Sequence, residues 1–409
     1  MVTSEQSSEY KYLITTAFMG FGHLRAAHNI ASQSRSPILR VDRDPYMNGI
    51  DEFLWKSSQF IHTYGSRDKE SNGKFLYSWF ERTMAIPENG VPPPLGPSRF
   101  VKTMWKFGAG DKLFETLSRD NPTLLHTFYL PAILAMYHGY RGKSFLLLCD
   151  TDFHRVWAPI DPGKYDLRYC VPISSSADRL ISYGVNKEKI FVTGFPLPSI
   201  NTGGRDLRVL EREFDFRKSR LERDSTAPLT IMFPFSGAGA YSNVLADLVK
   251  SIHEDLKEGS LRLIVSCGDS MHALRSAENL FVNYGIEESE FAEIMFREDI
   301  FAAFDEFNLA LRSTDVMITK PSEMVFYGAL GIPLVFLPPI GAHEEKNRDY
   351  LFSNECAVNM VPSTDFPRWL ERSRRKGLLL ELAENGFTRL PKNGGTAIDE
   401  LLVDGSPEF

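Results

Sequence analysis

Short apolar segments typical of β-strands alternate with helical segments through both halves of this chain, and this alternation constrains its fold more than any other feature. A strand, a helix and a further strand in succession build a parallel sheet with helices packed on its faces. We therefore predict an α/β protein with two Rossmann-like sheets. The predicted strands are residues 12–17, 37–41, 123–127, 144–148, 169–172 and 190–193 in the first half, and 229–233, 261–267, 294–296, 316–319 and 333–336 in the second.

The length of the chain indicates two domains, because 409 residues exceed what a single hydrophobic core usually organises. Residues 197–228 carry paired glycines, a highly charged stretch and a proline before the next apolar strand, a composition typical of a linker. We predict a first domain over residues 1–196, this linker, and a second domain over residues 229–409 that ends in helices.

The segment 52–118 interrupts the alternation of strands and helices. It contains 12 aromatic residues, among them Trp55, Trp79 and Trp105, and nine Lys or Arg against seven Asp or Glu. This composition predicts helices with an aromatic face. Two interpretations stay open: a helical cap packed on the first sheet, or a functional site, which would be a hydrophobic acceptor site or a membrane-surface site where Trp and basic side chains lie together.

Charge and cysteine spacing exclude several classes of partner. The formal net charge is −7, whereas nucleic-acid binding needs a basic surface. The cysteines at 149, 170, 267 and 356 lack the spacing of a metal site, so buried reduced thiols are expected. The N-terminus is polar and no apolar run approaches the roughly 20 residues of a membrane helix. We therefore expect a cytoplasmic protein whose contact with the inner face of a membrane is at most peripheral.

The stretch TTAFMGFGHLRAAHNIA, residues 15–31, combines a strand, a glycine turn and a helix. Gly20 and Gly22 let a ligand approach the backbone closely, and the N–H groups at a helix start favour an anion or a hydroxyl group. His23 lies at that helix start, where an imidazole can accept a proton near neutral pH. A structural or solvated histidine is the alternative interpretation.

A second polar group follows the apolar strand 144–148 in the stretch DTDFHRVW. This strand delivers Asp150, Asp152 and His154 to its carboxyl end. One interpretation is that the Asp-x-Asp pair holds a divalent metal beneath a nucleotide diphosphate. The other is that Asp152 orients or replaces a general base while Asp150 caps the turn.

The second half repeats the opening arrangement in LTIMFPFSGAGAYSNVLADLV, although the full Gly-x-Gly-x-x-Gly spacing is missing. The N–H groups of its loop and helix start would hold a pyrophosphate without a metal. That loop comprises Ser236, Gly237, Ala238 and Gly239. Two further strand ends add polar groups suited to phosphate, sugar hydroxyls or ribose, namely Lys320, Ser322 and Glu323 after one strand and His343, Glu344 and Asn347 after the next.

Taken together, these stretches resemble glycosyltransferase family 28 of the GT-B fold. The matching features are GFGHLRAA, NPTLLHTFYLPA, DTDFHRVW, YCVPISSSADRLISYGVNKEKIFVTGFPL, TKPSE and GAHEEKN, which run through nearly the whole chain in the expected order. The pattern is most similar to the diacylglycerol glycosyltransferases, monogalactosyldiacylglycerol synthase and processive glucosyltransferase. It is more distantly similar to the lipid-intermediate N-acetylglucosamine transferase of peptidoglycan synthesis.

The resemblance implies two Rossmann-like domains that face a central cleft, and an inverting, metal-independent transferase with no cofactor besides its nucleotide-sugar donor. The donor, usually a UDP-sugar, would bind the second domain, and a sugar or lipid-linked acceptor the first. His23 and Asp152 would face the acceptor as alternative bases, with Gly20, Gly22 and His154 on the same side. Carried over by position, the donor residues are Gly194 and Ser236 to Gly239 near the diphosphate, Lys320, Ser322 and Glu323 along the donor, and His343, Glu344 and Asn347 near the sugar or ribose.

Two departures from the family pattern bear on the identity of the donor. The family typically has Lys-Pro-Gly-Gly followed by Glu-Ala, where this chain has Pro321, Ser322 and Glu323, and His343 stands where the family has Gln. Two other functions therefore stay open. One is a nucleotide-sugar epimerase or hydrolase of the same fold, and the other is a non-catalytic protein that binds a nucleotide sugar.

Overall fold

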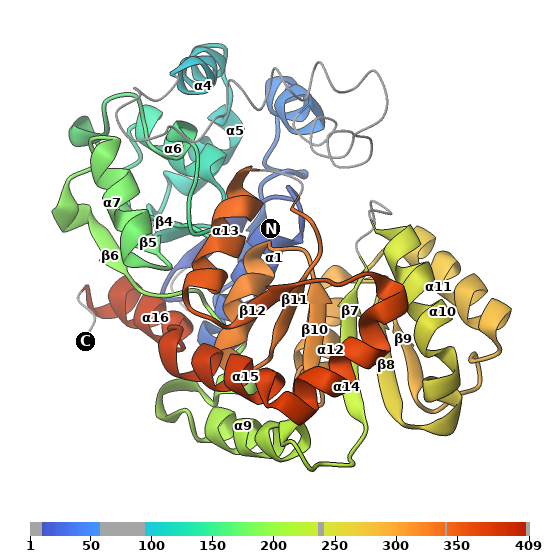
Figure 1. Ribbon diagram of the computed structural model, residues 1–409. Coiled ribbons are helices and arrows are strands. Elements are labelled where there is room, and N and C mark those ends of the chain that lie inside the picture. Colours follow the sequence, from blue (N-terminus) through green and yellow to red (C-terminus); the bar gives the residue numbers. More distant parts are fainter. Residues whose placement is uncertain (1–9, 58–94, 236–240, 340–341, 406–409) are drawn as a thin grey trace. The chain divides into compact units, whose positions relative to one another are not determined.

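The computed structural model describes residues 10–57, 95–235, 241–339 and 342–405. The chain forms two compact units, which Figure 1 shows coloured along the sequence. The first unit comprises residues 1–199 and 393–409, and the second comprises residues 200–392. Each unit is built on a six-stranded parallel sheet, so the predicted α/β class and the two Rossmann-like sheets are confirmed.

The sheet of the first unit has the order β2-β1-β3-β4-β5-β6. Its strands coincide with the apolar segments predicted from the sequence. They are β1 (Leu13–Thr16), β2 (Ile38–Arg40), β3 (Leu124–His126), β4 (Ser144–Leu147), β5 (Leu167–Val171) and β6 (Ile190–Val192). Since β3 lies on the other side of β1 from β2, the strand order reverses between β1 and β3.

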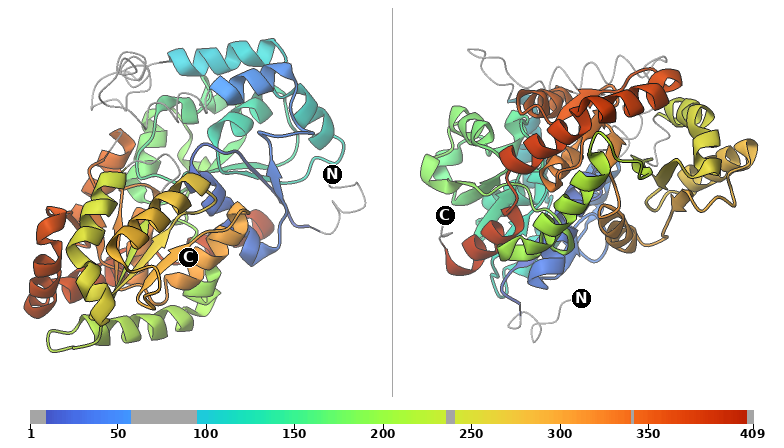
Figure 2. Two further views of the ribbon diagram at one scale, coloured as in Figure 1. Left: turned by 90° about the vertical axis from the view of Figure 1, so that its right-hand side faces the viewer. Right: turned by 60° about the horizontal axis from the view of Figure 1, so that its bottom comes forward.

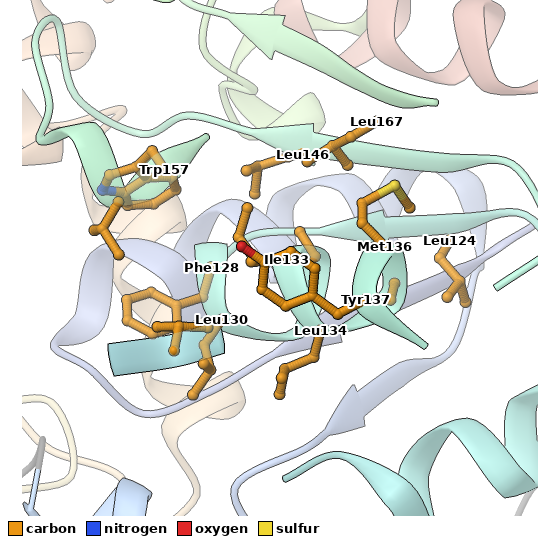
Figure 3. Packing of buried hydrophobic residues seen from close by; sticks show 14 of the residues in the cluster. Leu124, Phe128, Leu130, Ile133, Leu134, Met136, Tyr137, Leu146, Trp157 and Leu167 are labelled. Carbon is orange, nitrogen blue, oxygen red and sulfur yellow. The ribbon is translucent and has the colours of Figure 1, made fainter. Parts of the chain in front are cut away.

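Helices cover both faces of this sheet. One face carries α1 (Phe21–Ser34), whose Leu24, Ala27 and Ile30 are buried at helical spacing. The other carries α4 (Gly96–Lys106), α5 (Asp111–Leu117) and α6 (Tyr129–Tyr137). Figure 3 shows the core on this second face, where Leu124, Leu146 and Leu167 of the strands meet apolar side chains of α6. The remaining elements are η1 (Arg155–Trp157), η2 (Pro162–Lys164), α7 (Ser174–Ser182), η3 (Lys187–Lys189) and α16 (Gly394–Asp404).

Helix α16 corrects the predicted boundary of the second domain, because residues 393–409 belong to the first unit. The Tyr12 hydroxyl donates a hydrogen bond to Asp399 at 2.9 Å, and Gln33 of α1 bonds Thr396 at 3.2 Å. At Gly394 a Cβ would lie 2.2 Å from the Phe195 carbonyl oxygen, so only glycine fits this approach. The apolar period of α16 predicts a helix but does not say which sheet it covers.

The sheet of the second unit has the order β12-β11-β10-β7-β8-β9. Five of its strands match the predictions, and the short edge strand β12 was not predicted. The strands are β7 (Leu229–Pro234), β8 (Leu261–Ser266), β9 (Ala292–Met295), β10 (Val316–Thr319), β11 (Leu334–Phe336) and β12 (Ala357–Asn359). The strand order reverses between β7 and β10.

Figure 2 shows the sheet of the second unit between layers of helices. Side chains of α10, α11, α14 and α15 join one buried cluster with β7 and β8. The elements are α8 (Ser199–Thr202), η4 (Gly204–Asp206), α9 (Arg208–Leu221), α10 (Ser242–Glu258), α11 (Met271–Tyr284), α12 (Ile300–Ala310), η5 (Glu323–Leu330), α13 (Ala342–Ser353), η6 (Ser363–Asp365), α14 (Phe366–Lys376) and α15 (Leu378–Arg389).

Helix α9 shows that the predicted linker, residues 197–228, is wrong for most of its length. Arg217 is fully buried and donates to the carbonyls of Thr314, Leu330 and Leu311 at 2.7, 2.6 and 2.9 Å. Burial lowers the pKa of Arg217 to about 10. Arg220 pairs with Asp315 at 2.7 Å. Two charged residues of this stretch, Arg217 and Arg220, therefore anchor α9 within the second unit, whereas a linker would leave them in solvent.

The described part of segment 52–118 packs on the first sheet. Trp55 is buried 5.9 Å from the ring of Phe128, and Trp105 lies 5.5 Å from Tyr137. Among the described residues of this segment, Phe53, Phe100 and Phe107 are exposed. The buried contacts support the interpretation as a helical cap. The exposed rings are compatible with the alternative, an acceptor or membrane-surface site. Residues 58–94, which include Trp79, lie outside the described residues.

Two further sequence expectations concern cysteines and membrane spans. Cys149, Cys170, Cys267 and Cys356 are all buried free thiols, as predicted, and burial raises the pKa values of Cys170, Cys267 and Cys356. Within the described residues, no helix has the length and apolar character needed to cross a membrane.

Candidate functional site

The two reversals of strand order indicate where ligands bind. In open α/β sheets, ligands bind at the carboxyl ends of the strands where the order reverses. In the first unit this position lies beyond β1 and β3, and in the second unit beyond β7 and β10. Most of the side chains predicted for function follow these strands or their direct neighbours. We call the two positions the first-unit edge and the second-unit edge.

The glycine turn at the first-unit edge connects β1 to α1. Gly20 has a φ of +89°, which favours glycine, and it precedes the first residue of α1. Gly22 and His23 lie in the first turn of the helix. The Phe18 amide donates to Asp42 at 3.1 Å, and Arg40 binds the same carboxylate at 2.7 Å. The loop after β2 therefore holds the turn in place.

The imidazole of His23 lies against two aromatic rings. Its centroid is 5.0 Å from the ring of Phe128 and 5.7 Å from the ring of Trp157. The Thr16 hydroxyl donates to the His23 carbonyl at 3.3 Å. His23 is half-buried. His23 therefore lies at the strand reversal of the first unit, and its role as a base stays a prediction.

Asp152 is bound by an arginine that the sequence reasoning missed. Arg179 of α7 donates to both carboxylate oxygens at 2.8 Å, and the Phe153 amide donates to one of them at 2.9 Å. This pairing raises the pKa of Arg179. Both oxygens of the Asp152 carboxylate thus accept hydrogen bonds from within the first unit. This pairing fits the interpretation in which Asp152 orients its segment, and the choice between His23 and Asp152 as the base stays a prediction.

The other predicted residues of the first unit lie at neighbouring strand ends. Asp150 and His154 are half-buried in the segment between β4 and η1. Gly194 follows β6 with a φ of +86° and packs beside Gly394 of α16. Its predicted place near a diphosphate stays a prediction.

Three of the predicted donor residues come together at the second-unit edge. Lys320, which follows β10, donates to Glu344 of α13 at 2.8 Å. The Glu344 side chain is 2% exposed, whereas that of Lys320 is 36% exposed. The buried Asn347 of the same helix donates to the Pro321 carbonyl at 3.2 Å. The turn after β10 and the first turns of α13 thus form one polar cluster, in which Lys320 keeps contact with solvent.

The remaining donor residues surround this cluster or lie outside the described structure. Ser322 and Glu323 are buried at the start of η5, and His343 is half-buried in the first turn of α13. The loop Ser236, Gly237, Ala238 and Gly239 lies outside the described residues.

Tyr241 also lies at the second-unit edge, although it was not among the residues predicted from the sequence. It precedes α10 with a φ of +68°, and its hydroxyl donates to the Pro338 carbonyl. Burial and, to a smaller extent, the charge of Glu344 raise the pKa of Tyr241. Its position directly after the glycine-rich loop was the available signal.

Within the ranges that the structure describes, no three His, Cys, Asp or Glu side chains lie close enough together to hold one metal ion. The polar groups at the second-unit edge are a cation, a carboxylate and an amide, a set suited to phosphate and hydroxyl groups.

Comparisons with known proteins concern the family resemblance and the fold. Residues 279–350 match the family model "Domain of unknown function (DUF6938)". The chain is 21% identical over 352 residues to the processive diacylglycerol beta-glucosyltransferase of Staphylococcus carnosus, a match that covers 84% of this chain and 79% of the relative.

Two solved structures share the fold. MnaA of Staphylococcus aureus, solved with UDP, matches with a TM-score of 0.53 and 11% identity over 97% of this chain and 99% of that chain. MurG of Acinetobacter baumannii matches with a TM-score of 0.51 and 14% identity over 96% and 99%. These matches and the sequence similarity confirm that the chain has the GT-B fold and resembles the glycosyltransferases expected from its motifs.

Proposed function

We propose that this protein is a glycosyltransferase that moves a sugar from a UDP-sugar to the hydroxyl group of a lipid-linked acceptor, with inversion and without a metal or further cofactor. The observation that carries the proposal is His23 at the strand reversal of the first unit, on a glycine turn held by neighbouring segments. The similarity to a processive diacylglycerol beta-glucosyltransferase supports both the reaction and the acceptor class.

The donor half of the reaction is assigned to the second-unit edge. Lys320 is the solvent-contacting cation of the cluster, so it can exchange its bond to Glu344 for a diphosphate oxygen. Glu344 would then accept hydrogen bonds from hydroxyl groups of the sugar or ribose. Negative charge develops on the diphosphate as the glycosidic bond breaks, and Lys320 would stabilise that charge. The N-terminus of α10 would add its N–H groups.

The acceptor half is assigned to His23. The imidazole would remove the proton from the acceptor hydroxyl while that oxygen attacks the anomeric carbon from the side opposite the nucleotide. The bond to the diphosphate breaks as the new bond forms, so the configuration inverts. Asp152 would act through its ion pair with Arg179, which fixes the segment after β4.

The first unit would reach a lipid-linked acceptor through peripheral contact with the inner face of a membrane. The exposed fractions of Phe53, Phe100 and Phe107 are 62%, 50% and 67%. Arg99 and Lys106 are exposed on α4, the same helix as Phe100. Aromatic and basic side chains together suit a peripheral contact with anionic lipid.

The test is an assay with EDTA-treated protein, a panel of radiolabelled nucleotide sugars, and vesicles with and without diacylglycerol. We expect a labelled glycolipid from one UDP-sugar, with inverted anomeric configuration by NMR. Free sugar or an epimer formed without an acceptor would favour the epimerase or hydrolase. Nucleotide binding with no turnover of any acceptor, soluble sugars included, would favour a non-catalytic binding protein.

A further inference from the structure

The imidazole of His23 is held by aromatic rings from two other strand ends. Phe128 follows β3 and directly precedes α6, and Trp157 lies in η1, after β4. We propose that Phe128 and Trp157 are positioning residues that orient the imidazole of His23 for proton transfer. This inference rests on the proposed role of His23 as the base.

Ring geometry supports a fixed arrangement. Phe128 meets His23 nearly edge to face, with an interplanar angle of 65°, and Trp157 meets it at a tilt of 39°. The two rings also contact each other, 5.9 Å apart at 78°, and Figure 3 shows them side by side. Edge-to-face contacts at such distances are favourable. The imidazole therefore has a defined surface on two sides.

Neither ring can easily turn away from His23. Phe128 is 6% exposed and Trp157 is 7% exposed. A second layer of rings lies behind them: Tyr129 is 4.5 Å from Phe128 and 5.4 Å from Trp157, and Trp55 is 5.9 Å from Phe128. Close packing of this kind resists rotamer changes. The low exposure also means that these two rings support His23 rather than offer a surface for a ligand.

The main chain of His23 is fixed independently of its ring. Thr127, between β3 and Phe128, donates from its hydroxyl to the Thr16 hydroxyl at 2.8 Å, and Thr16 donates to the His23 carbonyl at 3.3 Å. This relay ties the ends of β1 and β3 to the first turn of α1. With the carbonyl and the ring both held, the remaining freedom of His23 is small.

Such fixation matters because proton transfer depends on the position of the base. A displacement of about 1 Å can reduce turnover on the order of 100-fold. The π face of an indole also favours a nearby cation, so Trp157 would stabilise the imidazolium that forms when His23 takes the proton. A smaller aliphatic side chain at position 157 would remove both effects.

The test combines kinetics with NMR on the full-length protein. Trp157→Leu should lower kcat by roughly 10- to 100-fold with the KM for the UDP-sugar unchanged. It should also lower the apparent pKa of the acidic limb of the pH–rate profile. Trp157→Phe restores an aromatic face and should recover most of the loss. Trp105→Leu is the matched control, because it removes an indole of the first unit whose ring packs on Tyr137 instead.

The NMR readout does not need catalytic activity. Imidazole protons of His23, assigned with His23→Gln, should have ring-current shifts that change in Trp157→Leu and stay in Trp105→Leu. Unchanged His23 signals in Trp157→Leu, or an equal loss of kcat in Trp105→Leu, would overturn the inference. If the parent transfers no sugar although the His23 signals change as expected, the proposed function fails while the ring contact stands.

Discussion

A buried histidine beneath the first-unit edge makes the stability of that unit depend on pH. His126 of β3 is completely buried, and its Nδ1 atom lies 2.6 Å from the Thr15 hydroxyl. Burial lowers the pKa of His126 from 6.5 to about 3. The folded state therefore keeps the ring neutral at a pH where the unfolded chain protonates it.

The sign and size of the effect follow from proton linkage. Stability is fully present above pH 6.5, and it falls as the pH drops from 6.5 towards 3 because the unfolded state binds one more proton. Between pH 8 and pH 5, this one group should cost the first unit about 2 kcal/mol. In His126→Asn, which keeps a polar atom near Thr15 but does not titrate, this part of the pH dependence should disappear.

Tryptophan fluorescence can isolate the first unit. Trp369 is the tryptophan of the second unit, whereas positions 55, 79, 105 and 157 belong to the first. Urea unfolding of Trp369→Phe, with and without His126→Asn, is measured between pH 8 and pH 5. Parallel stability profiles for the two proteins would refute the reasoning about His126.

Three further predictions concern the second unit and the surface of the first. Arg217→Met should destabilise the second unit by about 3 kcal/mol or more in urea unfolding followed by Trp369 fluorescence, because each buried carbonyl left without a donor costs about 1–3 kcal/mol. The exposed Arg212→Met on the same helix is the control, and equal losses would contradict the role of Arg217. Lys320→Met should weaken UDP binding by roughly 10- to 100-fold in calorimetry with EDTA present, whereas the exposed Lys346→Met should not. Unchanged affinity in Lys320→Met would remove it from the donor site. Phe100→Ser with Phe107→Ser should abolish flotation with anionic vesicles without changing UDP affinity, and flotation equal to the parent's would exclude this surface as the membrane contact.

The strands could be predicted because each is a short, buried apolar run, and the polar clusters at their carboxyl ends could be predicted because parallel strands end at one edge. The three-residue strand β12 is only partly buried, which leaves little periodic signal. The sequence predicts a linker where α9 lies, because charged residues are usually exposed to solvent. Arg217, however, is on the buried face of this helix. Nothing in the composition of 394–404 indicates that α16 covers the first sheet.

The positions of the candidate side chains at strand ends could be predicted from the sequence, but the pairings between them could not. His23, Lys320, Glu344 and Asn347 were chosen from residue type and position, and the structure brings the last three together. The ion pair between Asp152 and Arg179 joins residues 27 positions apart, so no local sequence pattern predicts it. The ring contacts of His23 likewise depend on how three strand ends converge in space. Tertiary packing, rather than local sequence, sets these interactions.

The most direct test of the proposed chemistry compares the parent with His23→Ala in metal-free transfer from a saturating UDP-sugar to diacylglycerol vesicles. If His23 is the base, kcat should fall by roughly 100-fold or more while UDP affinity, which is assigned to the second unit, stays unchanged. Asp152→Asn serves as the comparison, because its carboxylate is bound by Arg179. Turnover by His23→Ala close to that of the parent would contradict the assignment, and a loss confined to Asp152→Asn would transfer the role to Asp152.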